Sequence, residues 1–165
     1  MTALPDGRGT RAGLAFARIV LGLLWLTQVV WKMPPDFKLL TRFTSYAVEY
    51  EVFPPWAFIV EKVILPNMTL FGYVTLVMEA SIAAFLILGL ATRLWALIGL
   101  SMTIPIMLSS LNAPHEWSWA YYMMFTLHVV VLATAAGRAG GLDGLLRPAW
   151  QAGRGRLSRL LVVAS

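Results

Sequence analysis

Four long apolar segments constrain the fold of this sequence more than any other feature. They span residues 12–31, 68–91, 94–111 and 117–136. A helix rises 1.5 Å per residue, so about 18 residues reach ~27 Å, close to the ~30 Å hydrocarbon core of a bilayer. Hydrophobic residues make up 59% of the chain and charged residues 13%, too little charge to cover a soluble domain. We therefore predict an all-α fold, a bundle of four transmembrane helices forming a single integral membrane domain over residues 1–165.

The distribution of arginine predicts the orientation of these helices. Eight arginines flank the helix ends that would share one side of the membrane: Arg8, Arg11, Arg93, Arg138, Arg147, Arg154, Arg156 and Arg159. Basic residues next to transmembrane helices favour the cytoplasmic side. We expect both termini in the cytoplasm and the protein in a bacterial cytoplasmic (inner) membrane. The net charge of +5 comes from these flanking residues, so it does not indicate nucleic-acid binding.

Two further segments are expected to lie on the membrane surface. Two Pro-Pro pairs divide the outer connection, residues 32–67, into a short helix from Asp36 to Phe53 and an apolar segment over 56–65. The second piece, with ten residues, is too short to span, and we predict that both pieces form an interfacial helical segment over the outer end of the bundle. The tail, residues 145–163, mixes leucine with arginine and predicts a basic amphipathic helix attracted to anionic lipid.

Ionisable side chains inside the apolar segments need a structural or functional reason, because charge in a bilayer is unfavourable. Arg18 lies in the first segment and Glu79 near the middle of the second. A structural ion pair between Arg18 and Glu79 would reduce the desolvation penalty of both. Alternatively, the two side chains anchor a ligand or hold a proton-active carboxylate, or they do not meet.

His128 suggests a ligand site inside the bundle. It shares one helical stripe with Tyr121 and Phe125. A histidine donor, flat aromatic rings and a carboxylate that exchanges protons would suit a quinone head group. We therefore predict quinone contacts from Arg18, Glu79, His128, Tyr121 and Phe125. The alternative for the histidine and its stripe is ordinary core packing with a satisfied polar group.

The sequence excludes several cofactors. It contains no cysteine, which excludes disulfides, thiol redox chemistry, iron–sulfur clusters and covalently attached haem. His115 and His128 are 13 residues apart on one helix approach, about 20 Å along a helix, so they cannot clamp one haem together. We predict no metal and no cofactor held by the chain itself, with quinone as the candidate ligand. Lys32, His115 and Glu116 are expected at the outer interface, as an exposed salt bridge.

Short motifs distributed over residues 12–143 point to a known family. They are Ala17-Arg18-Ile19-Val20-Leu21-Gly22, Trp31-Lys32, Glu79, Leu88-Gly89-Leu90-Ala91-Thr92-Arg93, Glu116-Trp117-Ser118-Trp119-Ala120-Tyr121-Tyr122, Ala136-Gly137-Arg138 and Gly141-Leu142-Asp143. By these motifs the chain resembles the DoxX-like membrane proteins, including the DoxD-like small subunit of thiosulfate:quinone oxidoreductase. The resemblance implies a four-helix bundle within a larger membrane assembly, which in the named example passes electrons from a sulfur compound to quinone. It also implies family positions for charge at Arg18, Lys32, Glu79 and Asp143.

Three functions fit these features. The first is an accessory transmembrane subunit of a multi-subunit electron-transfer complex, respiratory or photosynthetic, which packs against other membrane subunits and shapes a quinone site or passage. The second is a quinone-reducing subunit that itself acts on a sulfur compound and is therefore an enzyme. The third is a small oligomeric transporter, ranked last because residues 94–111 offer only small hydroxyls to a polar path. We favour the first, because subunit packing requires least of the sequence.

Overall fold

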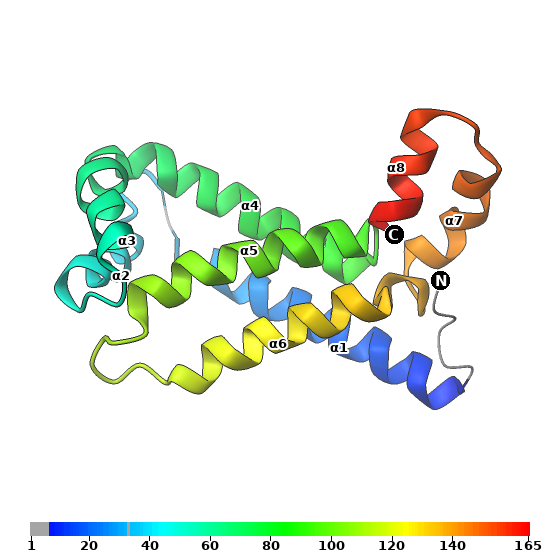
Figure 1. Ribbon diagram of the computed structural model, residues 1–165, viewed down its shortest axis with the longest axis horizontal. Helices are drawn as coiled ribbons and strands as arrows, with labels where there is room; N and C mark the ends of the chain where they lie inside the picture. The colour runs from blue at the N-terminus through cyan, green and yellow to red at the C-terminus, as the bar shows by residue number, and fades with distance from the viewer. Residues whose placement is uncertain (1–6, 33) are drawn as a thin grey trace.

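The body of the protein is a bundle of long helices. The structure is a computed structural model that describes residues 7–32 and 34–165, and these residues form helices and connections without a strand. Four helices run along the long axis of the molecule (Figure 1): α1 (Arg8–Val29), α4 (Met68–Leu88), α5 (Thr92–Ser110) and α6 (Ser118–Thr134). Both α1 and α5 pack against α4 and α6, so α4 and α6 occupy diagonal positions. The predicted all-α class is confirmed.

Three helical segments in the described part of the chain are long and apolar enough to cross a membrane. They are Arg8–Val29, Pro54–Leu88 and Thr92–Ser110. The apolar helix α6 has 17 residues, which reach ~26 Å and fall slightly short of a ~30 Å hydrocarbon core. Large apolar side chains are also exposed along these helices, as for Phe16 and Val30. The chain is therefore a membrane protein, and the fourth span stays a prediction.

The core lies where the four long helices meet. Leu21 and Trp25 of α1, Ile82 and Leu86 of α4 and Val131 of α6 are each at most 2% exposed and belong to one cluster. Outside this cluster the long helices present leucine, valine and aromatic side chains to their surroundings. This pattern suits a bundle whose solvent is lipid, because lipid does not force apolar groups inward.

The second half of the outer connection folds differently from the prediction. Residues 56–65 do not form a separate interfacial piece, because α3 (Pro54–Ile59) continues through a π turn (Val60–Ile64) and a 3₁₀ turn (Leu65–Asn67) into α4. The whole run, Pro54–Leu88, is one helical segment of 35 residues. Proline disturbs the hydrogen bonds of an α-helix, and a local change of helix type allows the helix to continue. The 3₁₀ turn here contains a proline within its first two residues.

The first half of the outer connection forms α2 (Lys38–Glu49), shorter at both ends than the predicted helix. Asp36 does not cap it, and the residue before the helix is Phe37, whose ring is buried against Gly72 of α4. A methyl group on Gly72 would lie 2.6 Å from that ring, so only glycine leaves room for it. Both α2 and α3 lie at the end of the bundle opposite α7 and α8 (Figure 1).

The tail forms two helices rather than one. A short turn (Ala136–Arg138) leads into α7 (Leu142–Ala152), and α8 (Arg156–Ala164) follows. The backbone is extended at Gly153 and Gly155, the caps that separate the two helices, since glycine is a poor helix former. This α7–α8 hairpin lies crosswise to the long helices, at the end of the bundle where α1 begins (Figure 1).

Candidate functional site: the buried charges of the bundle

A buried ion pair joins the end of α1 to the middle of α4. The Nζ atom of Lys32 lies 2.6 Å from Oε2 of Glu79, and the two side chains are 4% and 1% exposed. Lys32 also donates a hydrogen bond of 2.9 Å to the carbonyl of Gln28 in the last turn of α1, and its ammonium lies 3.9 Å from the ring centroid of Trp31. A carboxylate, a helix C-terminus and an aromatic face all stabilise a cation. This arrangement makes charge tolerable in an apolar bundle.

The predicted ion pair between Arg18 and Glu79 does not form. Arg18 is 1% exposed and its Nη1 donates to the carbonyls of Leu86 and Ile87, the latter at 2.8 Å. Because α1 and α4 are antiparallel, Arg18 lies opposite the C-terminal turn of α4. Carbonyls without an intrahelical partner and the negative end of the helix dipole attract a cation there.

Asp143 is the anionic counterpart at the same end of the bundle. Its carboxylate accepts hydrogen bonds from the backbone amides of Ala91 (2.7 Å) and Thr92 (2.9 Å), where α5 begins. Its own amide donates to the carbonyl of Gly89 at 2.8 Å. A carboxylate at a helix N-terminus satisfies amides that have no partner within the helix. Arg18 and Asp143 therefore hold the turn between α4 and α5 from two sides, an arrangement we call the turn clamp.

Two glycines make the turn clamp compact. Gly89 has a positive φ of 68°, and a methyl group there would lie 2.6 Å from Nη1 of Arg18. A methyl group on Gly137 would lie 1.9 Å from Oγ1 of Thr92 and 2.3 Å from Oδ2 of Asp143. Both positions therefore require glycine, one for its backbone conformation and both for space.

His128 lies in the middle of the bundle, bonded at both ring nitrogens. Nε2 accepts a hydrogen bond of 2.9 Å from the indole Nε1 of Trp25, and Nδ1 lies 2.7 Å from the carbonyl of Met124. Because Nε2 accepts, the ring proton belongs on Nδ1, which donates to that carbonyl. A methyl group on Gly99 would lie 2.3 Å from Nε2, so this glycine leaves space for the ring. Trp25 was not predicted as a polar partner, because its spacing indicates only a core position.

The five side chains predicted to bind quinone have separate contacts. Glu79 pairs with Lys32, the guanidinium of Arg18 binds the end of α4, and His128 binds Trp25. Tyr121 donates a hydrogen bond of 2.6 Å to Oε2 of Glu116, and Phe125 is 39% exposed on the outside of α6. Glu79 and His128 also belong to helices that are diagonal in the bundle. The quinone site therefore stays a prediction.

The prediction that Lys32, His115 and Glu116 form an exposed salt bridge at the outer interface is wrong for Lys32. Lys32 is buried with Glu79 rather than exposed in a salt bridge. Glu116 instead accepts the hydrogen bond from Tyr121, and His115 is exposed with a positive φ of 67°. The length of the lysine side chain explains the difference, because Lys32 follows the end of α1 and can still reach back into the bundle.

Arginines also close the far end of the tail. Arg147 donates to the carbonyl of Val162 at 2.7 Å, and Arg138 donates to that of Ser165 at the same distance. Burial lowers the pKa of Arg138, and the positive charges of Arg147 and Arg93 lower it further, while Asp143 raises it. These bonds satisfy carbonyls at the end of α8 and fix α8 against the bundle.

Comparison with known proteins gives the family. No curated protein and no solved structure matches the chain. The family model described as "TQO small subunit DoxD" matches residues 14–162, a span that begins within α1 and ends within α8. The match includes Arg18, Lys32, Glu79 and Asp143, the four buried charges of the bundle. It confirms the resemblance drawn from the sequence motifs, and the chain belongs to the DoxD family.

Proposed function

We propose that this chain is an accessory transmembrane subunit of a multi-subunit electron-transfer complex of the thiosulfate:quinone oxidoreductase type. The observation that carries the proposal is that Arg18, Lys32, Glu79, His128 and Asp143 are all engaged within the chain itself. Groups used in this way stabilise a bundle without a ligand, which supports an accessory role. The family description, a small subunit, agrees with a supporting role.

The exposed faces of the long helices would provide the contact with other subunits. Phe16 and Leu24 of α1 and Trp119, Tyr122 and Met123 of α6 are each more than half exposed. Aromatic and methionine side chains are enriched where proteins meet. In this proposal the sulfur compound is oxidised on another subunit, because this chain has no cysteine with which to relay it, and quinone passes along the apolar faces.

The proposed orientation places both termini in the cytoplasm of a bacterial inner membrane. The arginines in the first turn of α1, the arginine at the start of α5 and the arginines that follow α6 belong to one end of the bundle (Figure 1). The other end carries lysines and acids together, with Lys38 next to Asp36 and Lys62 next to Glu61. The excess of positive charge at one end supports the orientation by the positive-inside rule.

The test is gentle detergent extraction of the tagged chain from its native membrane, followed by mass spectrometry of the proteins that co-purify and an assay of thiosulfate-dependent quinone reduction. We expect a larger redox subunit to co-purify, and we expect activity from the assembly but none from the chain alone. Recovery of the chain alone with full activity would contradict the accessory role. Recovery as a homo-oligomer without a redox subunit would favour an oligomeric transporter.

A quinone-reducing site formed by Arg18, Glu79, His128, Tyr121 and Phe125 is the second candidate. The exposed ring of Phe125, one turn from the buried ring of Tyr121 on α6, supports it. Such a site requires His128 to leave Trp25 and donate to the quinone. His128→Gln should then raise the KM for quinone in assembled complex, whereas in the accessory role it lowers the amount of complex and leaves the KM unchanged.

A further inference from the structure

The α7–α8 hairpin carries a concentration of unpaired positive charge. Residues 144–165 contain four arginines and no acidic residue. Arg147 is bonded to the end of α8, whereas Arg154, Arg156 and Arg159 are exposed. None of these three is in an ion pair with a residue that the structure describes. The hairpin therefore presents three guanidinium groups without a counter-charge.

Exposed apolar groups lie beside these arginines on α8. Leu157, Leu160 and Val163 are each about two-thirds exposed, far more than expected for large apolar side chains facing water on a short helix. Their spacing places Leu157 and Leu160 on one face of α8. The helix thus combines cationic and apolar surface, which is the composition of helices that lie in a membrane interface.

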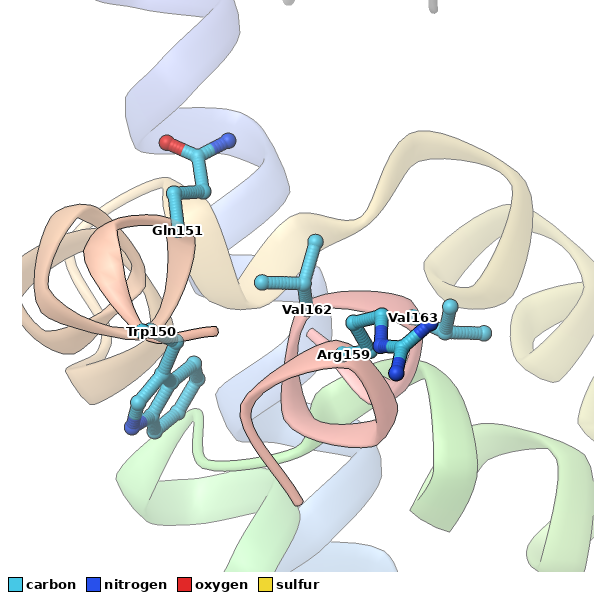
Figure 2. A pocket seen from close by; sticks show the side chains of 6 residues that line it. Trp150, Gln151, Arg159, Val162 and Val163 are labelled. Carbon is cyan, nitrogen blue, oxygen red and sulfur yellow. The ribbon is translucent and has the colours of Figure 1, made fainter. Parts of the chain in front are cut away.

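Two adjacent hollows bring the two kinds of surface together. The larger, of about 420 Å³, lies between α7 and α8 and is lined by Trp150, Gln151, Gly153, Arg159, Val162 and Val163 (Figure 2). The second, of about 350 Å³, is lined by Arg156, Arg159, Leu160 and Val163. Arg159 and Val163 belong to both, and in Figure 2 the guanidinium of Arg159 lies beside the methyl groups of Val163. A ligand in this pair of hollows would meet charge and hydrocarbon at once.

The position of the hairpin decides which ligand is available. It lies crosswise to the long helices at one end of the bundle (Figure 1). Since the long helices cross the membrane, a crosswise element at their end lies along the membrane surface. Its arginines are then within reach of lipid phosphates, and its leucines are within reach of the acyl chains once the hairpin is bound to the surface.

We propose that the α7–α8 hairpin binds an anionic phospholipid of the adjoining leaflet. Arg156 and Arg159 contact the phosphate and the anionic head group, and an acyl chain lies along Leu160, Val163 and the indole of Trp150. Charge complementarity carries the choice of occupant, because three unpaired arginines without an acidic neighbour fit an anionic surface. The proposal is independent of the electron-transfer role, since it requires only that the bundle is in a membrane.

The absence of cysteine permits a clean test with the full chain. Leu157→Cys, next to the hollows but not lining them, is labelled with a polarity-sensitive fluorophore. The protein is placed in nanodiscs of phosphatidylcholine alone or of phosphatidylcholine mixed with phosphatidylglycerol. We expect a blue shift of the emission in the mixed nanodiscs only, and its loss in high salt.

Two matched charge variants decide whether the hairpin is responsible. Arg156→Gln/Arg159→Gln should lower the ratio of the apolar to the polar form of the label in the anionic nanodiscs about 30-fold. This follows from about 1 kcal/mol for each arginine near an anionic surface and a tenfold change per 1.4 kcal/mol. Arg8→Gln/Arg11→Gln removes equal charge from exposed positions of α1 at the same end of the bundle and should leave the preference intact.

Three results would overturn the proposal. One is an emission that is the same in both kinds of nanodisc, and another is an equal effect of the two double variants, which would mean diffuse attraction without a site. The third is a label that stays polar in both nanodiscs and becomes apolar only in native membranes, which would show that a protein covers the hairpin. Gel filtration and circular dichroism of each labelled variant establish that it is folded before the comparison.

Discussion

The two ends of the bundle stabilise buried charge in different ways. Where α1 ends, Lys32 pairs with Glu79 of α4, 2.6 Å apart and almost wholly buried, and we call these two residues the outer pair after the predicted orientation. At the other end, the turn clamp binds its charges to backbone groups, with Arg18 on the carbonyls of α4 and Asp143 on the amides of α5. At the first end, each buried charge is neutralised by another side chain. At the second end, each buried charge is stabilised by hydrogen bonds to backbone groups.

This difference has an energetic consequence. When both members of a buried ion pair are replaced by apolar residues of similar size, the change is often close to neutral, whereas loss of one member is strongly destabilising. Backbone amides and carbonyls cannot be removed by substitution, so a buried group that loses its side-chain partner stays unsatisfied. The outer pair is therefore replaceable as a unit, and the turn clamp is not.

The largest effect is expected from breaking the outer pair on one side only. Lys32→Met leaves the carboxylate of Glu79 buried without a partner in the middle of α4, because the glutamate side chain is too short to reach water. It should lower the free energy of unfolding by about 4 kcal/mol. The measurement is SDS titration of purified protein in mixed micelles. Glu79→Leu should have a smaller effect, because the long side chain of Lys32 can turn outward from the end of α1.

The double variant Lys32→Met/Glu79→Leu is the control for that effect. We expect its free energy of unfolding to return to within about 1 kcal/mol of the original protein, because no buried charge remains. If the double variant were as unstable as Lys32→Met alone, the ion pair would stabilise the fold by more than mutual neutralisation of its charges. The outer pair would then be no more replaceable than the turn clamp.

The second largest loss of stability is expected from substitution of Asp143 in the turn clamp, and we expect that a second substitution does not restore the stability. Asp143→Ala removes the acceptor of the amides of Ala91 and Thr92 and should destabilise the protein by about 3 kcal/mol. Asp143→Asn retains one acceptor oxygen and should lose about half as much. Combining Asp143→Ala with Arg18→Met should destabilise further. Recovery of stability in that combination would show that the two side chains act as an ion pair.

The fold was largely predictable from the sequence because hydropathy determines which segments can cross a bilayer. The predicted segments at 12–31 and 117–136 correspond to α1 and α6 with small shifts at their ends. The outer connection was less predictable. The sequence predicts a separate piece over residues 56–65, and only the structure shows that a π turn and a 3₁₀ turn join this piece to α4.

The pairing of the buried charges was not predictable in the same way. Arg18 and Glu79 are both inside apolar segments, which made them apparent partners, whereas Lys32 follows its segment and looks exposed. Pairing depends on the depth that each side chain reaches, and hydropathy does not contain that information. The position of Asp143 was indicated only by the family resemblance, because an aspartate after a glycine and a leucine is also typical of an ordinary surface helix start.

A smaller effect is expected at the arginine of the turn clamp. Arg18→Met removes donors from the carbonyls of Leu86 and Ile87 and should lower the free energy of unfolding by about 2 kcal/mol. Arg18→Lys keeps the charge near the C-terminus of α4 but loses the planar donor group, so about half of that effect should remain. Equal stability of the lysine variant and the original protein would mean that charge alone is required.

The smallest effect is expected between the two ends, at the hydrogen bond from Trp25 to His128. Both groups are neutral, and a neutral hydrogen bond contributes about 1 kcal/mol. Trp25→Phe keeps most of the ring volume and leaves Nε2 of His128 without its donor, so the free energy of unfolding should fall by about that amount. Trp95→Phe, in which a half-buried ring stacked on Phe85 keeps its stacking, is the control for loss of an indole. A loss in Trp25→Phe as large as in Asp143→Ala would show that the middle of the bundle contributes as much as its charged ends, because removal of a neutral donor would then match removal of a buried carboxylate.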